Sequence, residues 1–284
     1  MTIEDIILDR DGRGISHLRP HLPSDFATQA AQLILANPGT AIITTGFYIL
    51  DAGMAETDGP PGAVVIGNAL ESLGYDVVYV TDRYATALMS TTGSDNARVI
   101  EFPIVDDDAS KAFAEGMMKE VNPSVIIAIE RCGWTDEGMY RNMRGRDITP
   151  HNARIDHIFS GSTPSVGVGD GGNEIGMGNL AEEVPKIETL VRLPCVTTVD
   201  KLILASVSNW GGYGLVAALS ELKGQNLLPT IEEDKALIRL TVDLGAVDGM
   251  SAKQEYKVDG FTLEENSQTV QALHDYLAEK GVES

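Results

Sequence analysis

Short apolar runs rich in β-branched residues alternate with segments of helical spacing over the first 170 residues. Runs at residues 40–47, 76–80, 97–102, 124–129 and 164–169 predict strands. Apolar residues three and four positions apart predict helices at residues 63–73, 108–121, 150–158, 209–222, 232–244 and 264–280. Continuous apolar runs such as residues 125–129 (VIIAI) are typical of strands covered on both faces. The pattern therefore predicts an α/β fold with a doubly wound, mostly parallel sheet and helices on both faces.

Length and composition favour one large domain. The chain has 284 residues, of which 43% are hydrophobic, and this is enough to bury a full core. The alternation of strands and helices becomes less regular toward the C-terminus. We therefore expect a single α/β domain over residues 1–284, in which residues from about 195 to 284 are a candidate sub-structure.

The charge balance excludes several classes of partner. Against 21 Lys and Arg the chain carries 42 Asp and Glu, a net charge of -21, so we expect neither nucleic-acid nor membrane binding. No apolar run reaches the roughly 18 residues of a membrane span. The acidic first thirteen residues do not resemble a targeting signal, which predicts a cytoplasmic protein. Cys132 and Cys195 lie 63 positions apart and indicate neither a disulfide framework nor a zinc site.

Polar residues follow the predicted strands where ligands bind in a parallel sheet, at the carboxyl ends. They stand at residues 44–46 (TTG), 81–83 (TDR), 130–131 (ER) and 170–174 (DGGNE). Four arginines follow within sixteen residues: Arg131, Arg141, Arg144 and Arg146. Guanidinium groups bind carboxylates and phosphates bidentately, so this cluster predicts an anion clamp. Surface ion pairs with neighbouring acidic residues are the alternative.

A glycine-rich segment at residues 167–172 (GVGDGG) matches the dinucleotide pattern G-x-G-x-x-G. The residues that follow are too rich in glycine to open a helix, which a pyrophosphate site requires. A nucleotide-dependent enzyme is therefore the weakest of our alternatives. The glycines favour instead a tightly turning frame from which Asp170, Asn173 and Glu174 project toward a small polar ligand.

Several blocks of the sequence resemble the D-glutamate cyclase-like family, over about residues 10 to 260. They are residues 44–47 (TTGF), 56–62 (ETDGPPG), 80–82 (VTD), 129–131 (IER), 142–148 (NMRGRDI), 169–178 (GDGGNEIGMG) and 247–249 (VDG). The match is to the C-terminal part of the vertebrate enzyme. The resemblance implies a lyase that dehydrates D-glutamate to 5-oxo-D-proline, a reaction of D-amino acid metabolism.

That reaction needs a base for the α-ammonium, an acid for the departing oxygen and groups that bind two carboxylates. The implied acid–base residues are Glu130, Asp170, Glu174 and Asp82. The implied substrate contacts are Thr45, Gly46, Glu56, Asp58, Arg131, Asn142, Arg144, Arg146, Gly171, Gly172 and Asn173.

The sequence requires no cofactor, but a divalent cation, Mg²⁺ or Mn²⁺, stays open. Its ligands would come from Glu56, Asp58, Asp82, Glu130 and Asp170, unless these carboxylates pair with the arginines. A second function also stays open, that of a module that binds an amino acid or another small anion without turning it over. The apolar stretch at residues 202–222 is a candidate interface for a homo-oligomer.

Overall fold

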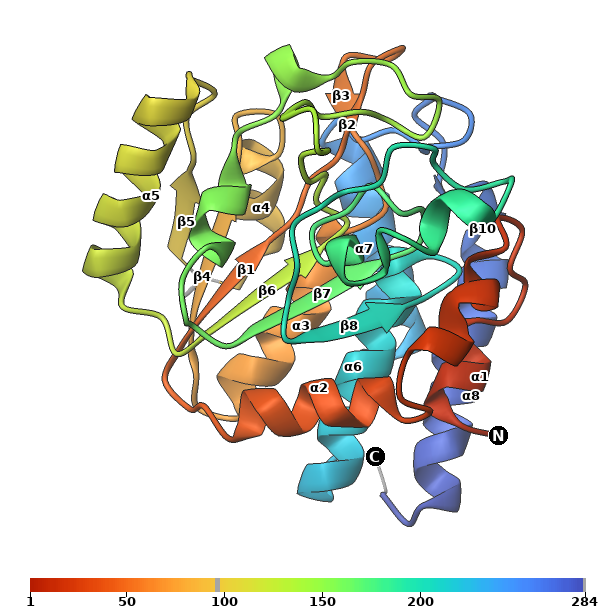
Figure 1. Cartoon of the computed structure of the whole chain (residues 1–284). Coiled ribbons are helices and arrows are strands. Elements are labelled where there is room, and N and C mark those ends of the chain that lie inside the picture. The colour runs from red at the N-terminus through yellow and green to blue at the C-terminus, as the bar shows by residue number, and fades with distance from the viewer. Residues whose placement is uncertain (95–97, 283–284) are drawn as a thin grey trace.

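The computed structural model describes residues 1–94 and 98–282 and is built on a six-stranded sheet with parallel pairing throughout (Figure 1). Across the sheet the order is β5, β4, β1, β6, β7, β8, so the first strand along the chain lies in the middle. The bounds are β1 (Thr40–Thr44), β4 (Asp76–Thr81), β5 (Arg98–Glu101), β6 (Val125–Ile129), β7 (Ser165–Gly169) and β8 (Lys201–Leu204). This is the strand order 3-2-1-4-5-6 of dinucleotide-binding folds.

Helices cover both faces of the sheet, because the chain winds outward from β1 in two directions. Crossovers between parallel strands are right-handed, so the connections on the two sides of β1 lie on opposite faces. On one face α2 (Phe26–Leu35), α3 (Pro60–Ser72) and α6 (Ser208–Lys223) pack together, and α4 (Thr86–Thr92) lies beside α3. On the other face α5 (Asp107–Val121) packs against the 3-10 segment η3 (Ile155–Phe159). The predicted α/β class and doubly wound parallel sheet are confirmed.

Three further helices pack on the outside of α3 and α6: α1 (Ile3–Ile7), α7 (Ile231–Asp243) and α8 (Leu263–Glu279). Thr230 and Thr262 begin α7 and α8 with capping boxes: the Thr hydroxyl accepts from the backbone N–H of the Glu three residues on, and the carboxylate of that Glu accepts from the Thr backbone N–H. Trp210 of α6 is fully buried and donates to Asn266 of α8 at 2.6 Å. None of the described helices is long and apolar enough to cross a membrane.

Several elements differ from the sequence prediction. The helices α2 and α4 and the strand β8 were not predicted, and the predicted strand at 97–102 begins at Ala97, which lies outside the described residues. The predicted helix at 150–158 is wrong, since the chain forms η2 (Thr149–His151) and η3 with extended backbone at Asn152 between them. The cause is tertiary: Ala153 donates its N–H to Asp82 and its carbonyl accepts from Arg131.

The apolar stretch at 202–222 is core rather than surface. Residues from Leu202 through Ser220 are buried within the chain, in β8 and in α6. Our reason for placing an interface there is therefore wrong, because a surface already covered by the chain is not available to a second copy. The homo-oligomer stays a prediction without that support.

Two small hairpins stand at the carboxyl edge of the sheet. One pairs β2 (Tyr48–Ile49) with β3 (Met54–Ala55), and the other pairs β9 (Lys257–Val258) with β10 (Phe261–Thr262). The second turns at Asp259 and Gly260, with φ of 52° and 82°, as expected of an Asp-Gly hairpin turn. The Thr57 hydroxyl donates to the Lys257 carbonyl at 2.7 Å, which ties this hairpin to the segment after β3. The remaining short segments are η1 (Ile15–His21), η4 (Met177–Leu180) and η5 (Val184–Lys186).

Candidate active site

A cavity of about 460 Å³ opens at the carboxyl edge of the sheet, in the size range of small-molecule sites. The chain turns away from the middle of the sheet in opposite directions after β1 and β6, which leaves a crevice between the ends of these strands. Loops after β1, β6 and β7, the β2–β3 hairpin, the N-terminal segment and the residues around the β9–β10 hairpin all line it.

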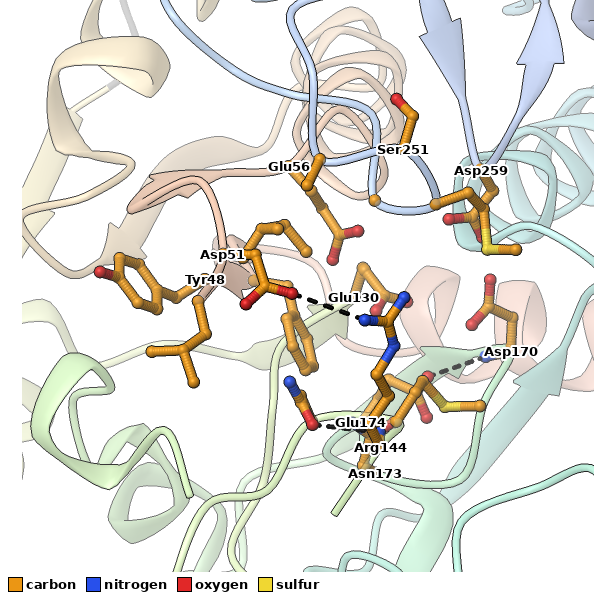
Figure 2. A pocket seen from close by; sticks show the side chains of 18 of the residues that line it. Tyr48, Asp51, Glu56, Glu130, Arg144, Asp170, Asn173, Glu174, Ser251 and Asp259 are labelled. Carbon is orange, nitrogen blue, oxygen red and sulfur yellow. Dashed lines mark hydrogen bonds and ion pairs between the residues drawn. The ribbon is translucent and has the colours of Figure 1, made fainter. Parts of the chain in front are cut away.

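Carboxylates form the floor of the cavity (Figure 2). Oxygens of Asp58, Asp170 and Asp259 lie within 4.8 Å of one another, and so do oxygens of Glu130, Asp170 and Glu174. Asp170 belongs to both groups and is their centre. Glu56 lines the same floor, and we call these six residues the acidic cluster.

Asp170 at the end of β7 is fully buried. Its Oδ1 accepts from Arg13, whereas its Oδ2 has no hydrogen-bond partner among residues 1–94 and 98–282. Burial raises the pKa of Asp170 more than the contact with Arg13 lowers it, and Glu130 adds to the rise. A buried carboxylate oxygen without a donor is costly, so this atom calls for a proton or a cationic ligand.

Glu130 follows β6 with a left-handed backbone, φ 43°, which is strained for a residue with a side chain. This turn carries the Glu130 side chain into the floor of the cavity, where its Oε2 accepts from the Ser208 hydroxyl at 2.6 Å. Burial and the charges of Glu174 and Asp58 raise the pKa of Glu130 well above its ordinary value. This rise in pKa favours the protonated form of the Glu130 carboxyl.

Glu56 faces the cavity from the segment after β3. Burial and the carboxylates of Glu130 and Asp259 raise the pKa of Glu56 well above its ordinary value. Gly249 packs against this carboxylate so closely that a Cβ at Gly249 would lie 2.2 Å from Glu56 Oε2. Because glycine has no side chain, position 249 leaves space for the Glu56 carboxylate.

Glu174 is held by its own glycine loop. Its two carboxylate oxygens accept from the N–H groups of Gly171 and Gly172, each at 2.8 Å. These two predicted substrate-binding glycines thus direct their amides to Glu174. A Cβ at Gly171 would lie 2.6 Å from the Met143 sulfur, so a larger residue there would displace the Met143 side chain.

Asp58 and Asn209 cap each other's helices. Asp58 accepts from the N–H groups of Ser208 and Asn209 at the start of α6, at 2.9 and 2.7 Å. The Asn209 side chain accepts in turn from Gly59 and Gly62 at the start of α3. Burial and the charge of Asp259 raise the pKa of Asp58 to about 7, although the N–H donors oppose the rise. Asp58 belongs to the acidic cluster but does not itself line the cavity.

Two arginines, Arg13 and Arg144, line the cavity. Arg13 donates to Asp170 through one terminal nitrogen and to Asp259 through the other, at 2.5 Å for the latter. Burial alone would lower the pKa of Arg13, but the charges of Asp170 and Asp259 hold it well above its ordinary value. Arg144 is 71% exposed and lies 3.5 Å from Asp51.

The predicted residues Arg131 and Asp82 lie apart from the cavity lining. They form a buried ion pair of 2.7 Å, and Arg131 also donates to the carbonyls of Gly46 and Ala153. These contacts fix the loop after β1 and interrupt the helix that we expected near Ala153. The structure thus places both residues where they hold the loops of the site.

Of the other predicted substrate-binding residues, some line the cavity and some do not. Asn142 and Asn173 line the cavity, and the Asn173 Oδ1 has no partner in the described part of the chain. Arg146 pairs with Asp51 at 2.5 Å and does not line the cavity. Thr45 is buried beside Gly59, and its hydroxyl finds no partner in residues 1–94 and 98–282.

Arg13 and Asp259 line the cavity but were not predicted as site residues from the sequence. For Asp259 a signal was present, because the residues 258–261 (VDGF) have the Asp-Gly pair of a tight hairpin turn between apolar residues. For Arg13 we find no such signal. It is one arginine in a loop after a short helix, and it contacts a residue 246 positions away.

Comparison with known proteins supports the family resemblance. The family model described as "D-glutamate cyclase-like, C-terminal" matches residues 3–274. The human protein named "D-glutamate cyclase, mitochondrial" is 34% identical over 234 residues. The alignment covers 75% of this chain and 37% of the human protein, so the chain spans well under half of that relative's length. The cytoplasmic location predicted for this chain stays a prediction.

Proposed function

The chain belongs to the D-glutamate cyclase-like family, and from this we propose that it is a lyase that converts D-glutamate to 5-oxo-D-proline and water. The observation that carries the proposal is Asp170, which is fully buried at the centre of the acidic cluster and has an oxygen that lacks a donor among the described residues. The substrate's α-ammonium is the group that such an oxygen would bind.

The reaction is balanced in protons. The α-nitrogen forms a bond to the γ-carbon, the bond from that carbon to one oxygen breaks, and the oxygen leaves as water. The ammonium loses two of its three protons, and the same number leaves on the oxygen. The site therefore only has to move protons from nitrogen to oxygen within one substrate molecule, which suits buried carboxyl groups with raised pKa values.

In the first step of our proposal the ammonium binds at Asp170 and Glu130. Carboxylates bind the charged amine, and one of them removes a proton so that the nitrogen has a free electron pair. Glu130 and Asp170 are both buried, and both have oxygens within 4.8 Å of each other. A proton taken by one of them is thus shared within the acidic cluster.

In the second step a protonated carboxyl donates to the departing oxygen. Burial and the carboxylates of Glu130 and Asp259 raise the pKa of Glu56 well above its ordinary value, which favours the protonated form of Glu56 and suits it as the acid. Binding in the cavity would hold the substrate folded, so that the amine meets the γ-carbon. Such positioning is worth several kcal/mol, up to about 10.

A divalent cation fits the same carboxylates, and we keep Mg²⁺ or Mn²⁺ as a variant of the proposal. Asp58, Asp170 and Asp259, or Glu130, Asp170 and Glu174, would hold it, since each set offers hard oxygen ligands and Asp170 has an oxygen without a donor in the described residues. When bound, the cation would neutralise the carboxylates and polarise the substrate's γ-carboxylate.

Proton NMR of the purified protein with D-glutamate, and separately with L-glutamate, tests the proposal. Each sample is run with EDTA and with added Mg²⁺ or Mn²⁺. We expect 5-oxoproline from the D isomer, and the EDTA sample decides whether a cation is needed. If the folded protein releases no product from either isomer, the proposed activity is wrong, and a module that binds an amino acid without turnover becomes the better account.

A further inference from the structure

The two arginines of the cavity have different partners and different surroundings. Arg13 is 22% exposed and is held by Asp170 and Asp259 of the acidic cluster. Arg144 is 71% exposed and touches Asp51. In Figure 2 the partners of these arginines lie on opposite sides of the cavity, with Asp51 on the Tyr48 side and Asp170 and Asp259 on the other. The cavity therefore offers two separate guanidinium groups.

We propose that these arginines divide the two carboxylates of the substrate between them: Arg13 binds the γ-carboxylate, which reacts, and Arg144 binds the α-carboxylate, which does not. The inference rests on the proposed function, because it takes an amino acid with two carboxylates as the substrate. It names which residue recognises which end of that molecule.

The position of Arg13 beside the acidic cluster assigns it to the reacting end. A guanidinium carries five N–H donors, of which Asp170 and Asp259 accept one each and the Met250 sulfur accepts a third at 4.0 Å. The remaining donors can bind a third carboxylate, and a carboxylate bound there is next to the groups that must exchange protons with it. Arg13 would also offset the repulsion between that carboxylate and the buried acids.

The weak contact between Arg144 and Asp51 leaves Arg144 free to bind the α-carboxylate, the end of the substrate that does not react. Its contact with Asp51 is 3.5 Å long, and Arg146 holds the same carboxylate at 2.5 Å. Arg144 can therefore leave Asp51 without stranding a charge, and an exposed pair of this kind contributes little. Its backbone meanwhile stays fixed, because the Asn142 side chain accepts from the N–H groups of Arg144 and Arg146, each at 3.0 Å.

Two half-substrates separate the roles, because each carries the amine and one of the two carboxylates. D-2-aminobutyrate has the α-carboxylate and lacks the γ-carboxylate, and 4-aminobutyrate has the reverse. Their dissociation constants are measured by ligand-observed NMR titration. This readout does not require turnover, so it also serves for variants that are inactive.

For Arg144→Gln we expect the dissociation constant of D-2-aminobutyrate to rise about 10- to 100-fold, as for loss of a charged hydrogen bond, and that of 4-aminobutyrate to stay within about twofold. For Arg13→Gln we expect the reverse. Arg13→Lys keeps the charge without the fork and should fall between wild type and Arg13→Gln. Arg192→Gln is the matched control: Arg192 shares a neighbouring groove with Arg144 but does not line the cavity, so both constants should stay unchanged.

Thermal melts of every variant establish that it is folded before it is titrated. Equal weakening of both half-substrates by Arg144→Gln, or by Arg13→Gln, would overturn the division of roles. Absence of saturable binding of both by the wild type would overturn it as well. These outcomes are independent of whether D-glutamate yields 5-oxoproline, so failure of the inference and failure of the proposed function are told apart.

Discussion

Gly249 is the residue at which a single methyl group should disable the site while the fold survives. Gly249 has no left-handed φ, so alanine is compatible with its backbone. The added Cβ would lie 2.2 Å from Glu56 Oε2, whereas ordinary contacts begin at 3.4 Å. The carboxylate must therefore withdraw by about 1 Å, and a displacement of that size at a reacting group costs roughly 100-fold in rate.

The effect on stability should be much smaller, because the clashing atom is the end of a side chain that can turn. We expect Gly249→Ala to lower the free energy of unfolding by about 1 kcal/mol, the low end for overpacking. The assay is kcat/KM for D-glutamate by proton NMR, alongside urea unfolding at the same pH.

The matched control is Gly116→Ala in the middle of α5. No atom in the described part of the chain lies within 4 Å of its added Cβ, and alanine favours the helix by about 0.5–1 kcal/mol. This variant should be slightly more stable and fully active. If Gly249→Ala kept wild-type activity, the carboxylate of Glu56 would not belong to the reacting machinery and the reasoning would be refuted.

Three further predictions concern the buried charges. Burial and the charges of Glu174 and Asp58 raise the pKa of Glu130, so its charged form destabilises the fold. At pH 8 the variant Glu130→Gln should therefore unfold at a higher urea concentration than wild type, although its turnover rate should fall at least about 100-fold. A variant less stable than wild type at pH 8 would contradict this. The pKa of Asp58 is about 7 in the fold against an ordinary 3.8, so its contribution to stability is complete below pH 4 and is lost as the pH rises through 7. Urea unfolding should therefore show a decrease of up to about 4 kcal/mol between pH 4 and 8, and a flat profile would count against it. Asp82→Asn leaves the buried charge of Arg131 uncompensated and should cost about 3–5 kcal/mol by urea unfolding, whereas a loss under 1 kcal/mol would show that the pair is dispensable.

The sheet and the place of the site were predictable because they follow from local pattern. Apolar runs mark buried strands, and the carboxyl-end rule places Glu130 and Asp170 at one edge before any coordinates are known. What the rule cannot supply is which charges already have partners. Arg131 looked available for a substrate carboxylate, yet it is buried outside the cavity lining, where it pairs with Asp82, a residue 49 positions earlier in the chain.

The two site residues that were not predicted, Arg13 and Asp259, come from segments that only the complete fold brings together. Arg13 precedes the first sheet strand and Asp259 follows the last, and they meet over Asp170. No periodic pattern or motif spacing in the sequence indicates that Arg13 contacts either aspartate. The irregular part at 150–158 was mispredicted for the same reason, because its backbone is drawn away from a helix by contacts of Ala153 with distant side chains.

The variant Asp170→Asn shows whether turnover depends on the carboxylate at the centre of the acidic cluster. Asparagine keeps the shape and the oxygen that faces Arg13 but removes the carboxylate at the centre of the acidic cluster. The measurement is the proton NMR time course of wild type and variant with D-glutamate, with binding followed by titration in the same samples. We expect 5-oxoproline from the wild type and a turnover rate at least about 100-fold lower in the variant, which should still bind D-glutamate, but more weakly, because the ammonium loses one of its carboxylate partners. Undiminished turnover by Asp170→Asn would contradict it.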